Sequence, residues 1–346
     1  MKFLIVSDLH IEDKSRWSLS SENEDLQYVI QQLKNLPKET FDVDAILVCG
    51  DTTDKPRENA TVIKNLRELF DSLNPLGKPV YVINGNHDAG NDNYLESIHK
   101  HAEYVGGKTL TVGDCTLSFM DYCNDLDKVR EFLKQEGSDI KVIHQSSAPF
   151  IGLEIEGLPI LHVEDYPTDC ICLVGDTHVP GLYDANNKFI LSPGSLYPHN
   201  KTEICKVENF LMILETNDSD ANLKAIPLKK RSGMALESTM SLESIKLSVE
   251  KFLTSEHALK PFIWVPDFAY PLYATDDRAI FKSVATYKEA SDSCIYQVDK
   301  LDIPELLNIA LEEAGVNDSR IREASFNLLK TFVESDDPNS VELLNF

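Results

Sequence analysis

Short apolar runs alternate with amphipathic segments over residues 2–198. The apolar runs, which predict buried strands, cover residues 3–6, 45–49, 80–83, 142–143 and 171–174. Apolar residues recur at helical spacing over residues 24–36, 60–73 and 93–105. This alternation of strands and amphipathic helices is typical of an α/β layered domain, and we expect the helices to cover a sheet.

Later in the chain the pattern predicts a second, smaller unit. Strand-like runs at 210–214 and 223–227 flank a polar turn and predict a hairpin that closes the main domain. The expected elements beyond it are a helix over 242–253, a strand over 262–265 and helices over 303–314 and 321–333. The expected domains are a main domain over 1–230, an α/β cap over 231–333, and an acidic linker with a partner-docking tail over 334–346.

Polar side chains directly follow each predicted strand of the main domain. In α/β sheets, ligands bind beyond the carboxyl ends of strands, where loops from several strands converge. Five loops can therefore share one site. The candidate residues in these loops are Asp8, His10, Asp51, Asn86, His87, Asp88, His144, Asp176 and His178.

The net charge of the chain limits the classes of function that are expected. The chain has 346 residues, and 33 basic against 57 acidic side chains give a formal net charge of −24. This charge repels a polyanion at long range and argues against a protein that only coats nucleic acid. A site that holds two divalent cations inverts the sign locally, so a nuclease stays compatible with the composition.

Cysteine usage and hydropathy indicate the compartment. The 7 cysteines are odd in number and form no C-x-x-C pair, so neither a disulfide framework nor a zinc knuckle is expected. No apolar stretch approaches the length of a membrane span. We therefore expect a reducing, cytoplasmic location and no membrane association.

The motifs at the strand ends differ in how strongly they indicate chemistry. Asp8 and His10 can coordinate one ion together, but similar pairs at loop starts are commonly only solvated. Gly50-Asp51 is equally a common turn. The segment G-N-H-D at 85–88 is more specific, because it combines an amide ligand, a protonatable imidazole and a carboxylate that can orient the imidazole.

In their order along the chain, these motifs resemble the pattern of the calcineurin-like metallophosphoesterase superfamily, which runs D-x-H, G-D, G-N-H-D/E, a lone H, and G-H-x-H. The resemblance implies a layered sandwich with two divalent metal ions. By position, the resemblance implies that the ligands of one metal are Asp8, His10, Asp51 and His178. It implies that the ligands of the other are Asp51, Asn86, His144 and Asp176. It also implies that His87 is the general acid or transition-state stabiliser, with Asp88 as its orienting partner.

One position departs from the family pattern. The segment at 175–178 reads G-D-T-H, so Asp176 stands where the family has an imidazole. A carboxylate is a harder, anionic ligand, and it should favour manganese or magnesium over softer metals. The alternative is that Asp176 swings away and leaves the second metal site weak or empty.

Within the superfamily, the chain resembles the SbcD-type nuclease subunits of DNA double-strand-break repair complexes. The resemblance is carried by His144-Gln145, by the segment S-P-G-S-L at 192–196, and by a cap-like region after the basic residues 229–231. It implies a manganese-dependent DNA exonuclease and endonuclease, a coiled-coil SbcC-type ATPase as partner, and a homodimer. Ser192, where the family has an aromatic residue, departs from the pattern, as does the acidic charge.

Two other functions stay open. A cyclic-nucleotide or nucleotide phosphodiesterase would use the same metals on a small substrate and would tolerate the acidic surface, but the cap argues against it. A non-catalytic scaffold for an ATPase partner is the second alternative. The intact ligand set argues against this scaffold, because buried acids and imidazoles without metals are costly.

Several other residues are interpreted as structural. We expect His99 and His101, on the helix predicted over 93–105, to be surface or dimer-contact residues, and His199 to be an exposed loop residue. We expect the aromatic side chains around Trp264 and Phe268 to form the core of the cap, although such a cluster can also stack on bases.

Overall fold

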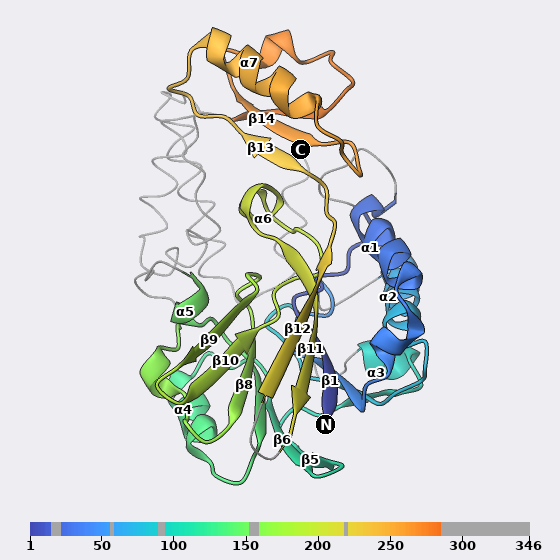
Figure 1. Ribbon diagram of the computed structural model, residues 1–346, viewed down its shortest axis with the longest axis vertical. Helices are drawn as coiled ribbons and strands as arrows, with labels where there is room; N and C mark the ends of the chain where they lie inside the picture. The colour runs from blue at the N-terminus through green and yellow to red at the C-terminus, as the bar shows by residue number, and fades with distance from the viewer. Residues whose placement is uncertain (15–21, 56–58, 89–93, 152–158, 218–220, 285–346) are drawn as a thin grey trace, which may run out of the picture. The chain divides into compact units, whose positions relative to one another are not determined.

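The computed structural model describes residues 1–14, 22–55, 59–88, 94–151, 159–217 and 221–284 (Figure 1). The described strands form three sheets. The first sheet contains, in spatial order, β12 (Ala221–Leu228), β11 (Asn209–Thr216), β1 (Lys2–Val6), β2 (Ala45–Val48), β3 (Val80–Val82) and β4 (Ala102–Tyr104). Strands β1 to β4 run parallel, β11 pairs antiparallel with β1, and β12 pairs antiparallel with β11. The predicted closing hairpin is therefore confirmed.

The second sheet also has a parallel centre. It contains, in spatial order, β5 (Thr109–Val112), β6 (Cys115–Met120), β7 (Ile140–His144), β8 (Ile171–Gly175), β10 (Lys188–Ser192) and β9 (Gly181–Ala185). Strands β6, β7, β8 and β10 run parallel, while β5 and β9 pair antiparallel at the two edges. Neither edge strand was expected from the sequence.

Helices occupy the connections between strands. They are α1 (Glu24–Asn35), α2 (Ala60–Leu73), α3 (Tyr94–Ile98), α4 (Leu126–Lys134), α5 (Ala148–Ile151), α6 (Lys201–Lys206) and α7 (Leu242–Leu253), with 3₁₀ turns η1 (Lys38–Phe41), η2 (Val163–Asp165) and η3 (Tyr270–Leu272). Asn23 and Asn59 begin α1 and α2, because each side-chain oxygen accepts hydrogen bonds from free backbone N–H groups of the first turn. Among the described residues, no helix has the length and apolar character needed to cross a membrane.

The period-two alternation of β1 shows how the layers form. Leu4 and Val6 pack into the core beneath α1 and α2, whereas Phe3 and Ile5 pack against the second sheet. The helix α4 covers the other face of the second sheet. The order helix, sheet, sheet, helix is a layered sandwich, so the predicted α/β fold class is confirmed.

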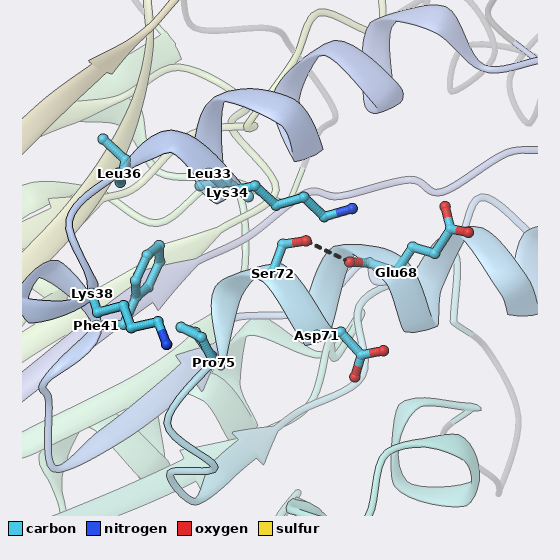
Figure 2. Close-up of a pocket in the computed structure, with 9 residues that line it drawn as sticks. All are labelled: Leu33, Lys34, Leu36, Lys38, Phe41, Glu68, Asp71, Ser72 and Pro75. Carbon is cyan, nitrogen blue, oxygen red and sulfur yellow. Dashed lines mark hydrogen bonds between the residues drawn. The ribbon is translucent and has the colours of Figure 1, made fainter.

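A groove lies between the carboxyl-terminal parts of α1 and α2 (Figure 2). It has a volume of 240 Å³, and it is lined by Leu33, Lys34, Leu36, Lys38, Phe41, Glu68, Asp71, Ser72 and Pro75. Its walls combine apolar side chains with lysines and carboxylates, and no imidazole lines it. None of the predicted ligands contributes to this groove.

Residues 233–284 contain the third sheet. Its strands β13 (Gly233–Ala235), β14 (Phe262–Pro266) and β15 (Ile280–Val284) are parallel. Ile263 and Val265 of β14 pack with α7, whereas Phe262 and Trp264 pack on the opposite side with Ile204 of α6. The predicted helix over 242–253 and strand over 262–265 are confirmed. The helices predicted over 303–314 and 321–333 and the tail over 334–346 lie outside the described residues, and the domain boundary at 230 stays a prediction.

A buried ion pair holds the chain where it enters the third sheet. Arg231 is fully buried, and its guanidinium donates to the carboxylates of Asp25 and Glu24 on α1 at 3.0 and 2.9 Å. It also donates to the carbonyl of Lys260. This arginine therefore ties the start of the third sheet to the first helix.

The segment 93–105 does not form the predicted continuous helix. The described part is helical only over Tyr94–Ile98, and Ala102–Tyr104 pairs with β3 as the strand β4. His99 is buried against Phe70 and not on the surface, so that expectation was also wrong. Pairing with an edge of the first sheet outweighs the helical spacing of the apolar residues here.

A buried lysine closes helix α4. Lys141, on β7, is 1% exposed, and its ammonium donates to the carbonyls of Phe132, Leu133 and Gln135 at the end of α4. The carbonyl of Phe132 also accepts the backbone N–H of Gln135. All three carbonyls lie at the negative end of the helix dipole, where a cation stabilises them. The interaction fixes α4 against the second sheet.

Replacing Lys141 should destabilise the fold. Lys141→Met keeps the apolar stem but removes the ammonium from the three carbonyls, and we expect a loss of about 2 to 3 kcal/mol in the free energy of unfolding. Urea denaturation followed by circular dichroism measures this value. The matched control is Lys128→Met, on the exposed face of α4, which should change stability by less than about 0.5 kcal/mol. Equal stabilities of the two variants would contradict the capping role.

Candidate metal centre

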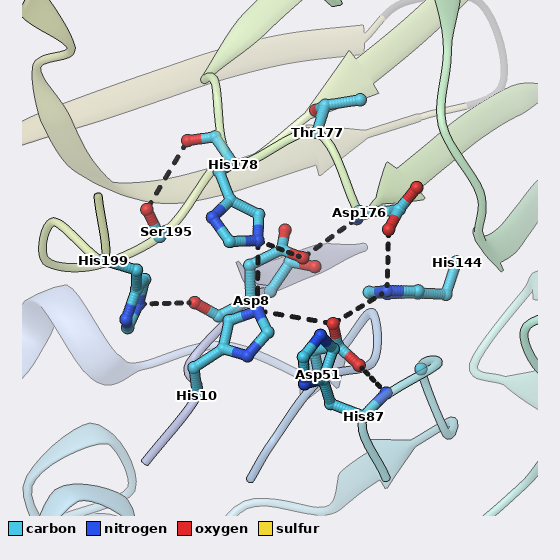
Figure 3. Close-up of polar contacts among 12 residues, drawn as sticks. Asp8, His10, Asp51, His87, His144, Asp176, Thr177, His178, Ser195 and His199 are labelled. Atoms are coloured by element: carbon cyan, nitrogen blue, oxygen red, sulfur yellow. Dashed lines mark hydrogen bonds and ion pairs between the residues drawn. The ribbon is translucent and has the colours of Figure 1, made fainter. Parts of the chain in front are cut away.

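The predicted ligands converge from both sheets. Asp8 and His10 follow β1, Asp51 follows β2, and Asn86 follows β3, all in the first sheet. In the second sheet, His144 ends β7, and Asp176 and His178 follow β8. Strands β1, β2 and β3 run parallel to one another, as do β7 and β8, so their carboxyl ends deliver these side chains to one place. Figure 3 shows the carboxylates and imidazoles of this cluster.

At five of the predicted ligands the backbone has a positive φ, a conformation that residues other than glycine rarely adopt. Asp8, His10, Asp51, Asp176 and His178 have φ values of 50°, 37°, 49°, 77° and 55°. The other two described non-glycine residues with positive φ are Asn186 and Asn187. Such backbone strain clusters at functional sites, where it is held by the surrounding structure. Here it turns each side chain into the shared centre directly after its strand.

Glycine is required beside the ligands because the loops approach each other closely. A Cβ on Gly85 would lie 2.1 Å from Asp51 Oδ1, and a Cβ on Gly175 would lie 2.4 Å from His144 Nδ1. No larger residue fits at either position without moving a ligand. The glycines of the G-N-H-D and G-D-T-H motifs therefore serve the packing of the site.

Asp51 lies at the middle of the cluster. Its Oδ2 is 3.3 Å from His10 Nε2 and 3.3 Å from His144 Nε2 (Figure 3). Its other oxygen accepts a hydrogen bond of 2.8 Å from the backbone N–H of His87. One carboxylate oxygen thus faces both groups of side chains, which is the position that a bridging ligand requires.

On one side of Asp51, two imidazoles and a carboxylate share a small space. His10 Nε2 lies 3.0 Å from His178 Nε2, and Asp8 Oδ1 lies 3.8 Å from the same nitrogen. Asp8 is fully buried, and its Oδ2 has no hydrogen-bond partner among the described residues. A buried, unpaired carboxylate oxygen is costly, and a cation among these atoms would satisfy it.

On the other side, His144 faces two oxygen ligands. His144 Nδ1 donates to the carbonyl of Cys49 at 2.7 Å, which leaves Nε2 as an acceptor in the neutral ring. This Nε2 is 3.1 Å from Asn86 Oδ1 and 3.8 Å from Asp176 Oδ1. Three acceptors that face one another are the arrangement that a shared cation stabilises.

Asp176 is held in place by a neighbouring hydroxyl. Ser146 Oγ donates to Asp176 Oδ2, and the backbone N–H of Asp176 donates to Asp8 Oδ1 at 2.9 Å. Burial raises the pKa of Asp176, although the nearby His144 opposes that shift. The carboxylate therefore lies within the cluster, although whether it binds a metal stays a prediction.

The imidazoles show the electrostatics of the site. Burial lowers the pKa of His178, but the adjoining Glu203 carboxylate outweighs burial and raises this pKa to about 9. Burial likewise lowers the pKa of His144, and the facing Asp51 outweighs burial and raises it well above its ordinary value. Burial raises the pKa of Asp51, but His144 and His10 bring it well below its ordinary range. The site therefore attracts positive charge.

The donor atoms suit divalent cations. Three groups have ligand atoms within 4.8 Å of one another, and they are Asp8 with His10 and His178, His10 with Asp51 and His87, and Asp8 with Asp51 and His144. Carboxylate and amide oxygens with imidazole nitrogens are ligands of manganese, magnesium and zinc. The described residues thus include the candidate ligands of a metal centre.

The prediction that Asp88 orients His87 is wrong. The Asp88 carboxylate accepts hydrogen bonds from the backbone N–H groups of Thr52, Thr53 and Gly85 at 3.1, 3.0 and 3.1 Å. It therefore joins the loops after β2 and β3, and both of its oxygens are engaged there. Burial and the nearby Asp51 charge raise the pKa of Asp88.

His87 is oriented instead by a residue that the sequence analysis missed. His87 Nδ1 donates to the carbonyl of Asp54 at 2.9 Å, and the ring lies edge-on to His10 with 4.7 Å between centroids. Asp54 Oδ1 also lies 3.4 Å from His10 Nδ1. Asp54 lies only three positions after Asp51 in the same loop, and this spacing could have indicated from the sequence that Asp54 belongs to the site.

Two further residues of the site were also missed. His199 is 4% exposed, and its Nε2 donates to the carbonyl of Asp8 at 3.1 Å, so it is not the exposed loop residue that we expected. Glu203 accepts a hydrogen bond of 2.8 Å from His178 Nδ1. The N-x-x-E spacing from Asn200 to Glu203, typical of a helix start, was the only local signal for Glu203.

Comparisons with known proteins identify the family to which the chain belongs. The sequence model of the calcineurin-like phosphoesterases matches residues 1–180. The DNA double-strand break repair protein Mre11 of Archaeoglobus fulgidus is 20% identical over 237 residues, which are 61% of this chain and 53% of that protein. The chain thus spans about half the length of this relative.

Solved structures with similar folds are distant in sequence. A novel archaeal phosphodiesterase is 14% identical, with 65% of this chain and 100% of that chain covered and a TM-score of 0.38. The Zn²⁺ complex of Vps29 from Entamoeba histolytica is also 14% identical, with 66% and 100% covered and a TM-score of 0.32.

The family match covers more than half of the chain, and it includes every predicted ligand of the metal centre. It also ends just after His178, the last of these ligands. The chain belongs to the calcineurin-like phosphoesterase family, whose members use divalent metals.

Proposed function

We propose that the chain is a manganese-dependent two-metal phosphodiesterase that cleaves DNA. The observation that carries this proposal is the convergence of carboxylate, imidazole and amide donors around Asp51. One ion would be held by Asp8, His10, Asp51 and His178, and the other by Asp51, Asn86, His144 and Asp176, so that Asp51 would serve both as the bridge.

Each part of the reaction then has a residue that serves it. Two divalent cations would activate the attacking water and neutralise the charge of the phosphate oxygens. His87 would donate a proton to the leaving oxygen. Its ring is partly exposed, with 43% of the side chain accessible, and the bond from Nδ1 to Asp54 leaves Nε2 available for the substrate.

DNA as the substrate has its own support. The relative from Archaeoglobus fulgidus is a DNA double-strand break repair protein, and the resemblance to SbcD-type nucleases implies the same substrate class. The same resemblance supports a coiled-coil SbcC-type ATPase as partner and a homodimer as the assembly. The net charge of −24 favours the second candidate, a cyclic-nucleotide or nucleotide phosphodiesterase, because a small substrate needs no extended basic surface.

Removing the central carboxylate tests the metal mechanism. Asp51→Asn keeps the shape of the side chain but weakens the bridge between the ions. We expect manganese-dependent cleavage of linear double-stranded and single-stranded DNA to fall on the order of 10³-fold. Gel assays measure the loss. Asp127→Asn, which changes an exposed carboxylate on α4, is the matched control and should retain wild-type activity.

Small substrates assayed beside DNA separate the alternatives. Turnover of cyclic or linear nucleotides without DNA cleavage would replace the nuclease proposal with the nucleotide phosphodiesterase. A folded, manganese-loaded chain that cleaves neither substrate would instead be the non-catalytic scaffold.

His87→Gln should show the leaving-group dependence of a general acid. We expect the kcat for DNA to fall roughly 10²- to 10⁴-fold, because the leaving alkoxide needs a proton. The kcat for bis(p-nitrophenyl) phosphate should fall far less, because nitrophenolate leaves without one. Equal losses on both substrates would refute the role. His162→Gln, at an exposed histidine outside the cluster, is the control.

Manganese binding should release protons. Without metal, the His178 ring with its pKa of about 9 holds a proton at pH 7.5. This proton stabilises the metal-free fold below pH 6.5, and the stabilisation is lost as the pH rises through 9. We therefore expect manganese affinity to rise from pH 6.5 to 9, because the ligand must be neutral.

Calorimetry in HEPES and Tris at pH 7.5 measures the protons released. His178→Ala should release about one proton fewer than the wild type. Affinity that does not change with pH would contradict the assignment of His178 as a ligand.

A further inference from the structure

Glu203 is a buried carboxylate at the metal centre to which no catalytic role has yet been given. It is 2% exposed and lies on the short helix α6. Its oxygens accept hydrogen bonds from His178 Nδ1 at 2.8 Å, from Ser195 Oγ at 3.2 Å, and from the backbone N–H of His199 at 2.8 Å. The side chain of Asn200 donates to it as well. A buried anion with this many donors is fixed in position.

The contact with His178 determines how that ring presents its other nitrogen. In the neutral ring, which is the form that binds a cation, Nδ1–H donates to Glu203 and the lone pair of Nε2 faces His10 and Asp8. A carboxylate behind a metal-binding imidazole fixes the tautomer and the ring orientation and makes the imidazole a stronger ligand. Glu203 therefore acts on the centre through His178.

The loop before α6 holds the backbone of two other ligands. His199 Nε2 donates to the carbonyl of Asp8 at 3.1 Å (Figure 3). The hydroxyl of Tyr197 donates to the carbonyl of His10 at 3.3 Å. Because Glu203 also binds the backbone N–H of His199, it ties this loop to the ring of His178. One carboxylate thus connects α6 with ligands that follow both β1 and β8.

The other side of α6 meets the third sheet. Ile204 forms a buried apolar cluster with Phe262 and Trp264 of β14, and the ammonium of Lys201 lies 5.7 Å from the centre of the Trp264 ring. A Cβ on Gly233 of β13 would lie 2.9 Å from Ile204 Cγ2, so this strand rests directly on the helix.

The chain entering the third sheet also holds the end of α6. The ammonium of Lys230 donates to the carbonyls of Glu203 and Val207. The helix is therefore fixed by the third sheet on one side and by the metal ligands on the other. A shift of the sheet against the helix would be passed on to the Glu203 carboxylate.

We propose that Glu203 is a positioning residue for His178, and that α6 makes the cation affinity of this ligand depend on the packing of the third sheet. The inference rests on the proposed function, since it takes His178 as a metal ligand. A partner or substrate that displaced the third sheet would then weaken metal binding at the position that contains His178. The other position would keep all of its ligands.

The test measures manganese binding by the full chain. Glu203→Ala removes the acceptor, and we expect one of the two manganese ions to bind roughly 10- to 100-fold more weakly while the other changes little. Glu203→Gln keeps an oxygen acceptor without the charge, so its loss should be smaller. Electron paramagnetic resonance of free Mn²⁺ during titration measures both affinities. Excess Mn²⁺ should restore cleavage by both variants, which a general loss of folding would not allow.

A second pair of variants tests the link through α6. Trp264→Leu opens the face of β14 that packs on α6, whereas Phe281→Leu opens the opposite face of the same sheet, towards α7. We expect Trp264→Leu to weaken the same manganese ion by a few-fold and Phe281→Leu to leave it unchanged. Equal effects of the two variants would overturn the link.

The possible failures are distinguishable. Wild-type manganese affinities in a folded Glu203→Gln, and in Glu203→Ala where it folds, would overturn the positioning role while the proposed function stands. A wild-type chain that binds two Mn²⁺ ions and loses one in Glu203→Ala supports both. A wild-type chain that binds no Mn²⁺ overturns both.

Discussion

The buried carboxylate of Asp51 sets the constraint that the surrounding structure has to meet. It is 1% exposed, and its oxygens face the imidazoles of His10 and His144 and the backbone of the loop after β3. Asp8, fully buried beside it, has an oxygen without a hydrogen-bond partner among the described residues. A buried anion is tolerated only when hydrogen bonds or positive charge compensate it, and the free oxygen of Asp8 has no hydrogen bond. This need for cations explains why strand ends of both sheets deliver nitrogen and oxygen donors to one point.

Bringing five loops to one point requires backbone distortion. Positive φ at a residue other than glycine costs of order 1 to 3 kcal/mol, and five predicted ligands adopt it. The distortion persists because other groups hold the loops. Asp88 binds the backbone of the loops after β2 and β3, and Asp121 accepts a hydrogen bond of 2.8 Å from the backbone N–H of Asn84. The two carboxylates beside the centre therefore support its geometry, while the core between the sheets supplies the rigid frame.

The sequence predicted what periodicity and motif spacing determine. The strands before the ligands and the helices over 60–73 and 242–253 follow from apolar patterns that burial dictates. The short edge strands β5 and β9 could not be found, because they are largely exposed and carry little apolar signal. Asp88 was misassigned because adjacency in the sequence does not determine which groups a side chain contacts, and its partners lie in the loop after β2. Glu203 was missed because its role depends on a contact between distant segments, and no local pattern specifies such a contact.

Because Asp176 is a carboxylate, the centre carries one more negative charge than a site with an imidazole at this position. With Asp8 and Asp51 it makes three carboxylates, so two divalent cations would leave one net positive charge among the ligands instead of two. A phosphate would then be attracted less strongly, and only when both cations are bound would the sign be favourable at all. In a chain with a net charge of −24, binding of a polyanion therefore depends on metal loading more steeply than in a basic protein. Any contact that alters how His178 is held, such as that of Glu203, would accordingly control substrate binding as well as the metal.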